Sequence, residues 1–220
     1  MALTQERAEL RSKAIEKGSI LYNFHVSLQK GDLYSGYAEI LFRISEVPQE
    51  LVVDFKGKEV TRLFQNGEDA NVKLEGGFLY LETSKLKVGE NAVGIHYQSC
   101  YDNDGSGCVS FVDVDSKQYI YTQFEPYYAN RVFPCFDQPD LKAKMSLTVL
   151  SPAEWKKVLS NEYAIVEKDL DKELYLKNSK FSFSDELSRF LEGKEGRMTI
   201  FPETKTLPTY LFCFIAGEYL

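Results

Sequence analysis

From residue 19 onward, apolar and polar residues alternate with a period of two, and turn residues interrupt this pattern at short intervals. In residues 19–29, Asn23 and His25 fall on one face of the expected strand. Tyr22, Phe24 and Val26 fall on the other face. After a short Lys-Gly-Asp turn, residues 33–45 continue the alternation. This arrangement predicts a β-hairpin.

Further short runs rich in β-branched and aromatic residues follow along the rest of the chain, and Gly, Asn, Asp or Pro separates most of them. They cover residues 50–57, 59–67, 71–82, 89–99, 118–125, 143–152, 162–170, 174–184, 198–204 and 209–220. The sequence therefore predicts an all-β fold, an antiparallel β-sandwich or saddle. Only residues 152–159 and 185–193 suggest short helices within it.

A short N-terminal helix is expected to precede the β domain. Thr4 can cap it and Gly18 can end it, which places the helix over residues 4–17. Its apolar stripe is thin and includes Leu10 and Ile15. We therefore divide the chain into a docked helical arm, residues 1–18, and a β domain, residues 19–220.

Charge and composition exclude some classes of partner. The formal net charge is −7, and no run of Lys or Arg is long enough to follow a phosphate backbone, so we expect no nucleic-acid partner. The first 18 residues contain no apolar run of seven or more, so we expect no membrane anchor and a cytoplasmic location. Residues 207–220 are strongly apolar to the last position, and we expect further chain to follow them.

The sequence contains no recognisable catalytic centre. It has neither the zinc motif H-E-x-x-H nor the nucleophile motif G-x-S-x-G. His25 and His96, the two histidines, lie in separate strand-like runs without a second ligand at metal-binding spacing, and we expect them to be structural. We therefore predict no catalytic residue and no metal ligand in this segment.

The loop at residues 102–107 is acidic and rich in glycine, and it leaves two alternatives open. Cys100 and Cys108 bracket it, so a disulfide could close it, although we expect reduced thiols in this compartment. Its aspartates, together with Asp113 and Asp115, could also offer oxygen ligands to calcium, but the EF-hand spacing is missing. A surface turn is the expected structure.

The stretch from Tyr121 to Met145 contains an unusual mixture of aromatic residues, prolines and charges. If residues 119–125 form a strand, Phe124 faces the core, whereas Gln123 and Glu125 face the opposite side. Pro126 lacks a backbone donor and ends the strand. Gln123 and Glu125 are thus predicted to project from the end of a sheet.

The residues that follow are expected to hold this strand end in place. Phe133, Pro134 and Phe136 form an apolar wedge that is flanked by Arg131 and Asp137. We expect the arginine and the aspartate to pair with each other or with the backbone.

This stretch resembles the N-terminal domain of the zinc aminopeptidases related to aminopeptidase N and puromycin-sensitive aminopeptidase. The matching residues are Thr122-Gln123-Phe124-Glu125-Pro126, Ala129, Arg131, Phe133-Pro134-Cys135-Phe136-Asp137, Pro139 and Lys142-Ala143. Residues 105–126, 158–162 and 207–219 are also similar to the family, and residues 3–15 look like the start of its cytosolic members. The resemblance thus covers nearly the whole chain.

The resemblance implies a β saddle that lies against a thermolysin-like catalytic domain. That catalytic domain would supply the zinc, its H-E-x-x-H ligands and a Gly-x-Met-Glu-Asn motif, all of which are absent from this chain. Gln123 and Glu125 match the positions that bind the N-terminus of a peptide substrate. Pro126, Arg131, Phe133, Pro134 and Asp137 would support them.

Two further expectations follow from the resemblance. The Glu125–Pro126 bond is expected to be cis, as it often is in the family. Before a proline, the cis isomer costs little free energy relative to trans. The segment alone is expected to be inactive. The alternative function is a non-catalytic peptide- or protein-binding β module.

Overall fold

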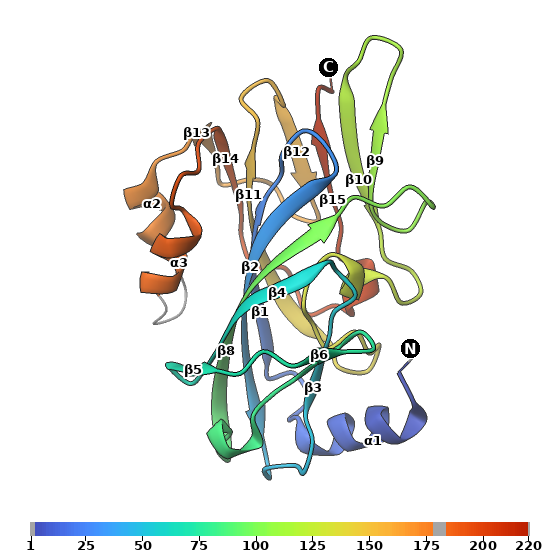
Figure 1. The fold of residues 1–220 in the computed structure, drawn as a ribbon, viewed down its shortest axis with the longest axis vertical. Coiled ribbons are helices and arrows are strands. Elements are labelled where there is room, and N and C mark those ends of the chain that lie inside the picture. Colours follow the sequence, from blue (N-terminus) through green and yellow to red (C-terminus); the bar gives the residue numbers. More distant parts are fainter. Residues whose placement is uncertain (1–2, 178–183, 220) are drawn as a thin grey trace.

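The computed structural model of the chain describes residues 3–177 and 184–219. Its largest element is an eight-stranded sheet (Figure 1). In spatial order the strands are β13 (Val166–Asp169), β14 (Arg197–Phe201), β11 (Ala143–Ser151), β1 (Ile20–Ser27), β2 (Leu33–Ile44), β8 (Gly89–Cys100), β4 (Glu59–Gln65) and β5 (Glu68–Ala70). The β1–β2 pair is the predicted antiparallel hairpin. β1 and β11 pair in parallel, which departs from the purely antiparallel expectation.

Two smaller sheets lie on one side of the large sheet, as Figure 1 shows. The four-stranded sheet has the order β12 (Lys157–Ser160), β15 (Phe214–Gly217), β10 (Gln118–Gln123) and β9 (Gly107–Val112). The three-stranded sheet has the order β3 (Val52–Asp54), β7 (Phe78–Tyr80) and β6 (Leu74–Glu75). Apolar side chains from all three sheets form one core, which confirms the all-β, sandwich-like fold.

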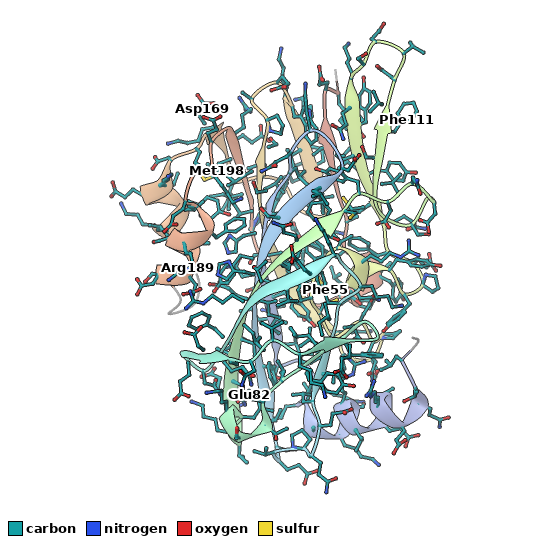
Figure 2. All side chains as sticks on the ribbon, viewed as in Figure 1. Phe55, Glu82, Phe111, Asp169, Arg189 and Met198 are labelled. Carbon is teal, nitrogen blue, oxygen red and sulfur yellow. The ribbon has the colours of Figure 1, made fainter. Side chains whose placement is uncertain are left out.

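A second, smaller core lies on the opposite face of the large sheet. There α2 (Lys172–Lys177) and α3 (Ser184–Phe190) cover the sheet, and Tyr175, Leu187 and Phe190 pack against Met198 and other apolar residues. Figure 2 shows Met198 and Arg189 on this same side of the molecule. The polar face that the periodicity predicts, which carries Asn23 and His25, is therefore partly covered by these two helices.

Two of the expected local structures are wrong. Residues 152–159 do not form a helix, because the buried Trp155 ends a turn and Lys157–Ser160 then pairs with β15 as strand β12. Residues 174–184 do not start as a strand: α2 forms instead, with its first turn capped by Asp171, whose Oδ1 accepts from the Leu174 amide at 3.0 Å. Residues 178–183 of that prediction lie outside the described residues. The helix expected at 185–193 is confirmed as α3.

The N-terminal helix α1 (Gln5–Ala14) is capped by Thr4, as predicted, because the Thr4 hydroxyl accepts from the Arg7 amide. It ends at Ala14, earlier than expected, since Ile15 already pairs with Ile44 of β2. Only the C-terminal end of the apolar stripe, Ala14 and Ile15, is buried against the domain. Leu10 is 45% exposed, whereas Arg11 is only 2% exposed and points into the protein.

The short 3₁₀ helices complete the described elements: η1 (Thr83–Lys85), η2 (Ala129–Arg131) and η3 (Thr209–Leu211). η2 lies within the stretch that follows β10, and η3 precedes β15. η2 contacts β9, and Thr209 of η3 donates a hydrogen bond to Asp137.

Both histidines are buried beneath the two helices that cover the large sheet. His25 Nδ1 lies 3.0 Å from the Tyr175 hydroxyl of α2, and His96 Nε2 lies 3.0 Å from Glu186 Oε2 of α3. Burial lowers the pKa of His96, and the neighbouring Glu186 only partly offsets this effect. Each histidine therefore has a structural partner, and each partner belongs to a different covering helix.

We expect the His96 imidazole to titrate below pH 6.5. The unfolded chain then binds more protons than the folded one near pH 6, so the free energy of unfolding falls as the pH decreases through this range. Because the sequence contains only two histidines, their two Cε1–H signals can be followed by NMR. His96→Gln identifies the signal. A His96 midpoint at or above pH 6.5 would contradict this expectation.

Candidate functional site

The end of strand β10 has the geometry that its sequence predicts. The strand ends at Gln123, Phe124 is buried, and Gln123 and Glu125 are exposed. The alternation of an extended chain explains this arrangement, because an inward Phe124 directs both neighbours outward. The Glu125–Pro126 bond is cis, which confirms that prediction.

Phe124 is fixed by the apolar wedge that follows it in sequence. Its ring meets Phe133 edge to face at 5.8 Å, and Phe133 stacks on Phe24 of β1 at 4.1 Å. Phe136 packs edge to face against Phe42 of β2 at 5.3 Å. The buried Pro134 lies between these two anchors. The wedge thus connects the end of β10 directly to the large sheet.

The neighbouring strand β9 constrains Gln123 from the side. Gln123 pairs with Gly107, whose φ of +80° belongs to the left-handed region that favours glycine. A Cβ atom at this position would lie 2.2 Å from Asp102 Oδ2. Glycine is therefore required here so that the 102–107 loop can close beside the strand end.

The side chains of Gln123 and Glu125 are themselves unpartnered. Within residues 3–177 and 184–219, neither one makes a hydrogen bond or an ion pair. A carboxylate and an amide at positions i and i+2 of an extended chain lie on the same side of it. They are thus available to a ligand that offers hydrogen-bond donors or a positive charge.

Asp137 supports the site, but its partner is not the expected one. Its carboxylate accepts hydrogen bonds from the Asn130 side chain at 2.6 Å, the Asn130 backbone amide at 3.0 Å and the Thr209 hydroxyl at 2.6 Å. Burial raises the pKa of this carboxyl. The expected Arg131–Asp137 pair is therefore wrong, whereas the expected backbone bond is present. Asn130, the residue adjacent to Arg131, donates the hydrogen bonds that Arg131 was expected to donate to Asp137.

Arg131 binds the acidic loop instead. Its Nη1 lies 2.8 Å from Asp104 Oδ2 and 3.3 Å from Asp102 Oδ1, and its guanidinium lies 4.6 Å from the centre of the Tyr128 ring. The hydrogen bond from Arg131 lowers the pKa of Asp104. Two of the four aspartates considered as calcium ligands, Asp102 and Asp104, are thus already paired with a cationic side chain of the protein itself.

The disulfide that could close the 102–107 loop is not formed. Cys100 and Cys108 are both free thiols in this structure, the first exposed and the second buried. Over the described ranges, no group of three or more His, Cys, Asp or Glu side chains is arranged to hold a metal ion.

Sequence reasoning missed Asp54, which lies at the end of β3. This carboxylate is fully buried, forms an ion pair with Arg11, and accepts hydrogen bonds from the Tyr127 hydroxyl and the Asp137 amide, both at 2.9 Å. The available signal was an aspartate inside the apolar run Leu-Val-Val-Asp-Phe. A charge in such a run is costly unless a partner meets it.

A large sheet with two small sheets on one face defines an all-β, sandwich-like domain. The sequence pattern of the Peptidase M1 N-terminal domain matches residues 19–211, so the chain belongs to this family.

Named relatives agree with the family. Aminopeptidase N of Streptomyces lividans is 33% identical over an alignment of 180 positions, which covers 76% of this chain and 20% of that protein. Probable aminopeptidase 1 of Saccharolobus solfataricus is 29% identical over 157 residues, 71% of this chain and 19% of that protein. The mitochondrial aminopeptidase 2 of Saccharomyces cerevisiae is 28% identical over 177 residues, 80% of this chain and 15% of that protein. The chain therefore spans a fifth or less of the length of these relatives.

Among residues 3–177 and 184–219, no helix is long and apolar enough to cross a membrane.

We expect Asp137→Ala to lower the free energy of unfolding by about 3 kcal/mol, because it leaves buried donors of Asn130 and Thr209 without an acceptor. Thr209→Val, which removes only one of those donors, should cost about 1 kcal/mol. Urea unfolding of the two variants tests both values. If Asp137→Ala stayed within 1 kcal/mol of the wild type, Asp137 would not be the support described here.

Proposed function

We propose that this chain is the substrate-anchoring domain of a zinc-dependent aminopeptidase, an enzyme that removes N-terminal amino acids from peptides. The observation that carries the proposal is the pair of unpartnered side chains, Gln123 and Glu125, on a rigidly packed strand end. The family and the relatives named as aminopeptidases support the same reading.

Glu125 is proposed to bind the free α-amino group of the substrate. That group has a pKa of about 7.7 to 8.0 in peptides, so it is largely protonated at neutral pH. A carboxylate forms a charge-assisted hydrogen bond with it, and the amide of Gln123 adds a second polar contact or lines the pocket for the first side chain. Two contacts fix where the substrate begins and hence which peptide bond is presented. Glu125 would then position the substrate and would not act as an acid or base.

The described residues of this chain do not offer a binding site for the zinc ion of such an enzyme. The sequence has no H-E-x-x-H motif, and the described residues provide no cluster of three or more suitable ligands. We therefore assign the metal and the hydrolytic step to a catalytic domain outside residues 1–220. Residues 1–220 would contribute substrate binding only.

The proposed partner of this chain is that catalytic domain, and the outer face of the four-stranded sheet is the surface proposed to meet it. Tyr121 lies on the same face of β10 as Gln123 and is 39% exposed, while Leu159 of β12 and Phe111 of β9 are more than half exposed. Figure 2 shows Phe111 on the β9–β10 hairpin, away from α2 and α3. The apolar residues on this face would bring a second domain next to Glu125.

We expect leucinamide, which has a free α-amino group, to bind the chain at millimolar concentration and to shift the side-chain amide NMR signals of Gln123. N-Acetyl-leucinamide lacks the charge and should leave them unshifted. Glu125→Gln should weaken leucinamide binding about fivefold, because an exposed ion pair contributes up to about 1 kcal/mol of free energy. Glu75→Gln, at an exposed glutamate on β6, is the matched control. Equal binding of both amides would refute the role of Glu125.

We also expect residues 1–220 to release no amino acid from fluorogenic aminoacyl substrates, with or without added zinc. Measurable turnover that Glu125→Gln abolishes would overturn the proposed division of labour. The gene sequence beyond Leu220 tests the same point: H-E-x-x-H and Gly-x-Met-Glu-Asn motifs support it, whereas a stop codon would favour a stand-alone peptide-binding module.

A further inference from the structure

Helix α1 lies outside the residues that match the family, 19–211, yet it is docked onto the segment that follows the candidate site. The Gln138 side chain donates to the Ala8 carbonyl at 3.0 Å, and the Ser12 hydroxyl donates to Asp140 at 2.6 Å. The helix thus contacts the chain shortly after the apolar wedge.

The strongest contact of the helix is the buried ion pair between Arg11 and Asp54. Arg11 is 2% exposed and Asp54 is fully buried. Arg11 donates through Nη1 to Asp54 Oδ2 and through Nη2 to Oδ1, the latter at 3.3 Å. A carboxylate in this position needs a cation, because an unpaired buried charge is strongly unfavourable. Arg11 therefore supplies the positive charge that faces the Asp54 carboxylate inside the protein.

The same carboxylate holds the segment that carries Glu125. Its Oδ1 accepts from the Tyr127 hydroxyl at 2.9 Å, and its Oδ2 accepts from the Asp137 amide at 2.9 Å. The ammonium of Lys56 lies 4.7 Å from the centre of the Tyr127 ring and holds that ring from another side. Tyr127 is two residues from Glu125, so fixing Tyr127 restricts where the Glu125 carboxylate can lie.

We propose that Arg11 is a positioning residue for Glu125, acting through Asp54 and Tyr127. The proposal rests on the function proposed above for Glu125. It gives the N-terminal helix a role in substrate binding, because a carboxylate binds an α-amino group well only when it is held in one position.

Tyr127→Phe is the most direct test, because it removes only the hydroxyl that reaches Asp54 and leaves the ring and the Arg11–Asp54 pair. We expect leucinamide to bind about threefold more weakly, as one hydrogen bond to a charged group is lost. Backbone amide exchange of residues 125–131 should rise about tenfold, since this segment opens more easily.

A paired change tests Arg11 itself. Arg11→Met alone would leave Asp54 buried and unpaired and could prevent folding, so it is combined with Asp54→Asn. The double variant should show the same loss of affinity as Tyr127→Phe. Arg7→Met is the matched control on the same helix: Arg7 bonds Glu50 and the Tyr80 hydroxyl but does not touch Asp54. It should leave leucinamide affinity unchanged.

The pattern across the variants separates the two proposals. Weaker binding in Glu125→Gln, Tyr127→Phe and Arg11→Met/Asp54→Asn, with Arg7→Met like the wild type, supports the positioning role. Weaker binding in Glu125→Gln alone would overturn the role of Arg11 and leave the function intact. Binding that does not depend on Glu125 would overturn both.

Discussion

The carboxylate of Asp54 is the point at which the separate parts of this domain meet. It is reached by Arg11 from the N-terminal helix, by Tyr127 from the turn after β10 and by the amide of Asp137. Removing one partner of such a buried pair typically costs about 3–5 kcal/mol, because the other charge remains without compensation. The helix, the three-stranded sheet and the candidate site are therefore connected through one buried carboxylate.

Around this group, the domain combines buried aromatic packing with free polar side chains. Phe124 and Phe133 tie the end of β10 to β1, and the alternation of the strand then leaves Gln123 and Glu125 pointing outward. The rigid corner and the exposed pair are thus consequences of the same few residues. The substrate-anchoring role proposed for this domain depends on both properties.

Local features of this site could be predicted from the sequence, because they depend on residues close together in the chain. The outward direction of Glu125 follows from a period of two, whereas the cis bond was expected from the family resemblance, at an X-Pro position where that isomer costs little. The partners of Arg131 and the role of Asp54 could not be predicted, because these contacts join residues far apart in sequence. Strand β12 replaced an expected helix for a similar reason: pairing with β15 overrode local preference.

The central claim is that Glu125 holds the substrate's amino group for a catalytic domain outside this chain. A chimaera tests it most directly: residues 1–220 replace the corresponding N-terminal part of Streptomyces lividans aminopeptidase N, and kcat/KM is measured for a leucine substrate. Glu125→Gln should lower kcat/KM about a hundredfold, the loss of a desolvated charge-assisted bond of roughly 3 kcal/mol, while Glu75→Gln should leave it unchanged. An active chimaera with equal kcat/KM in both variants would contradict the account.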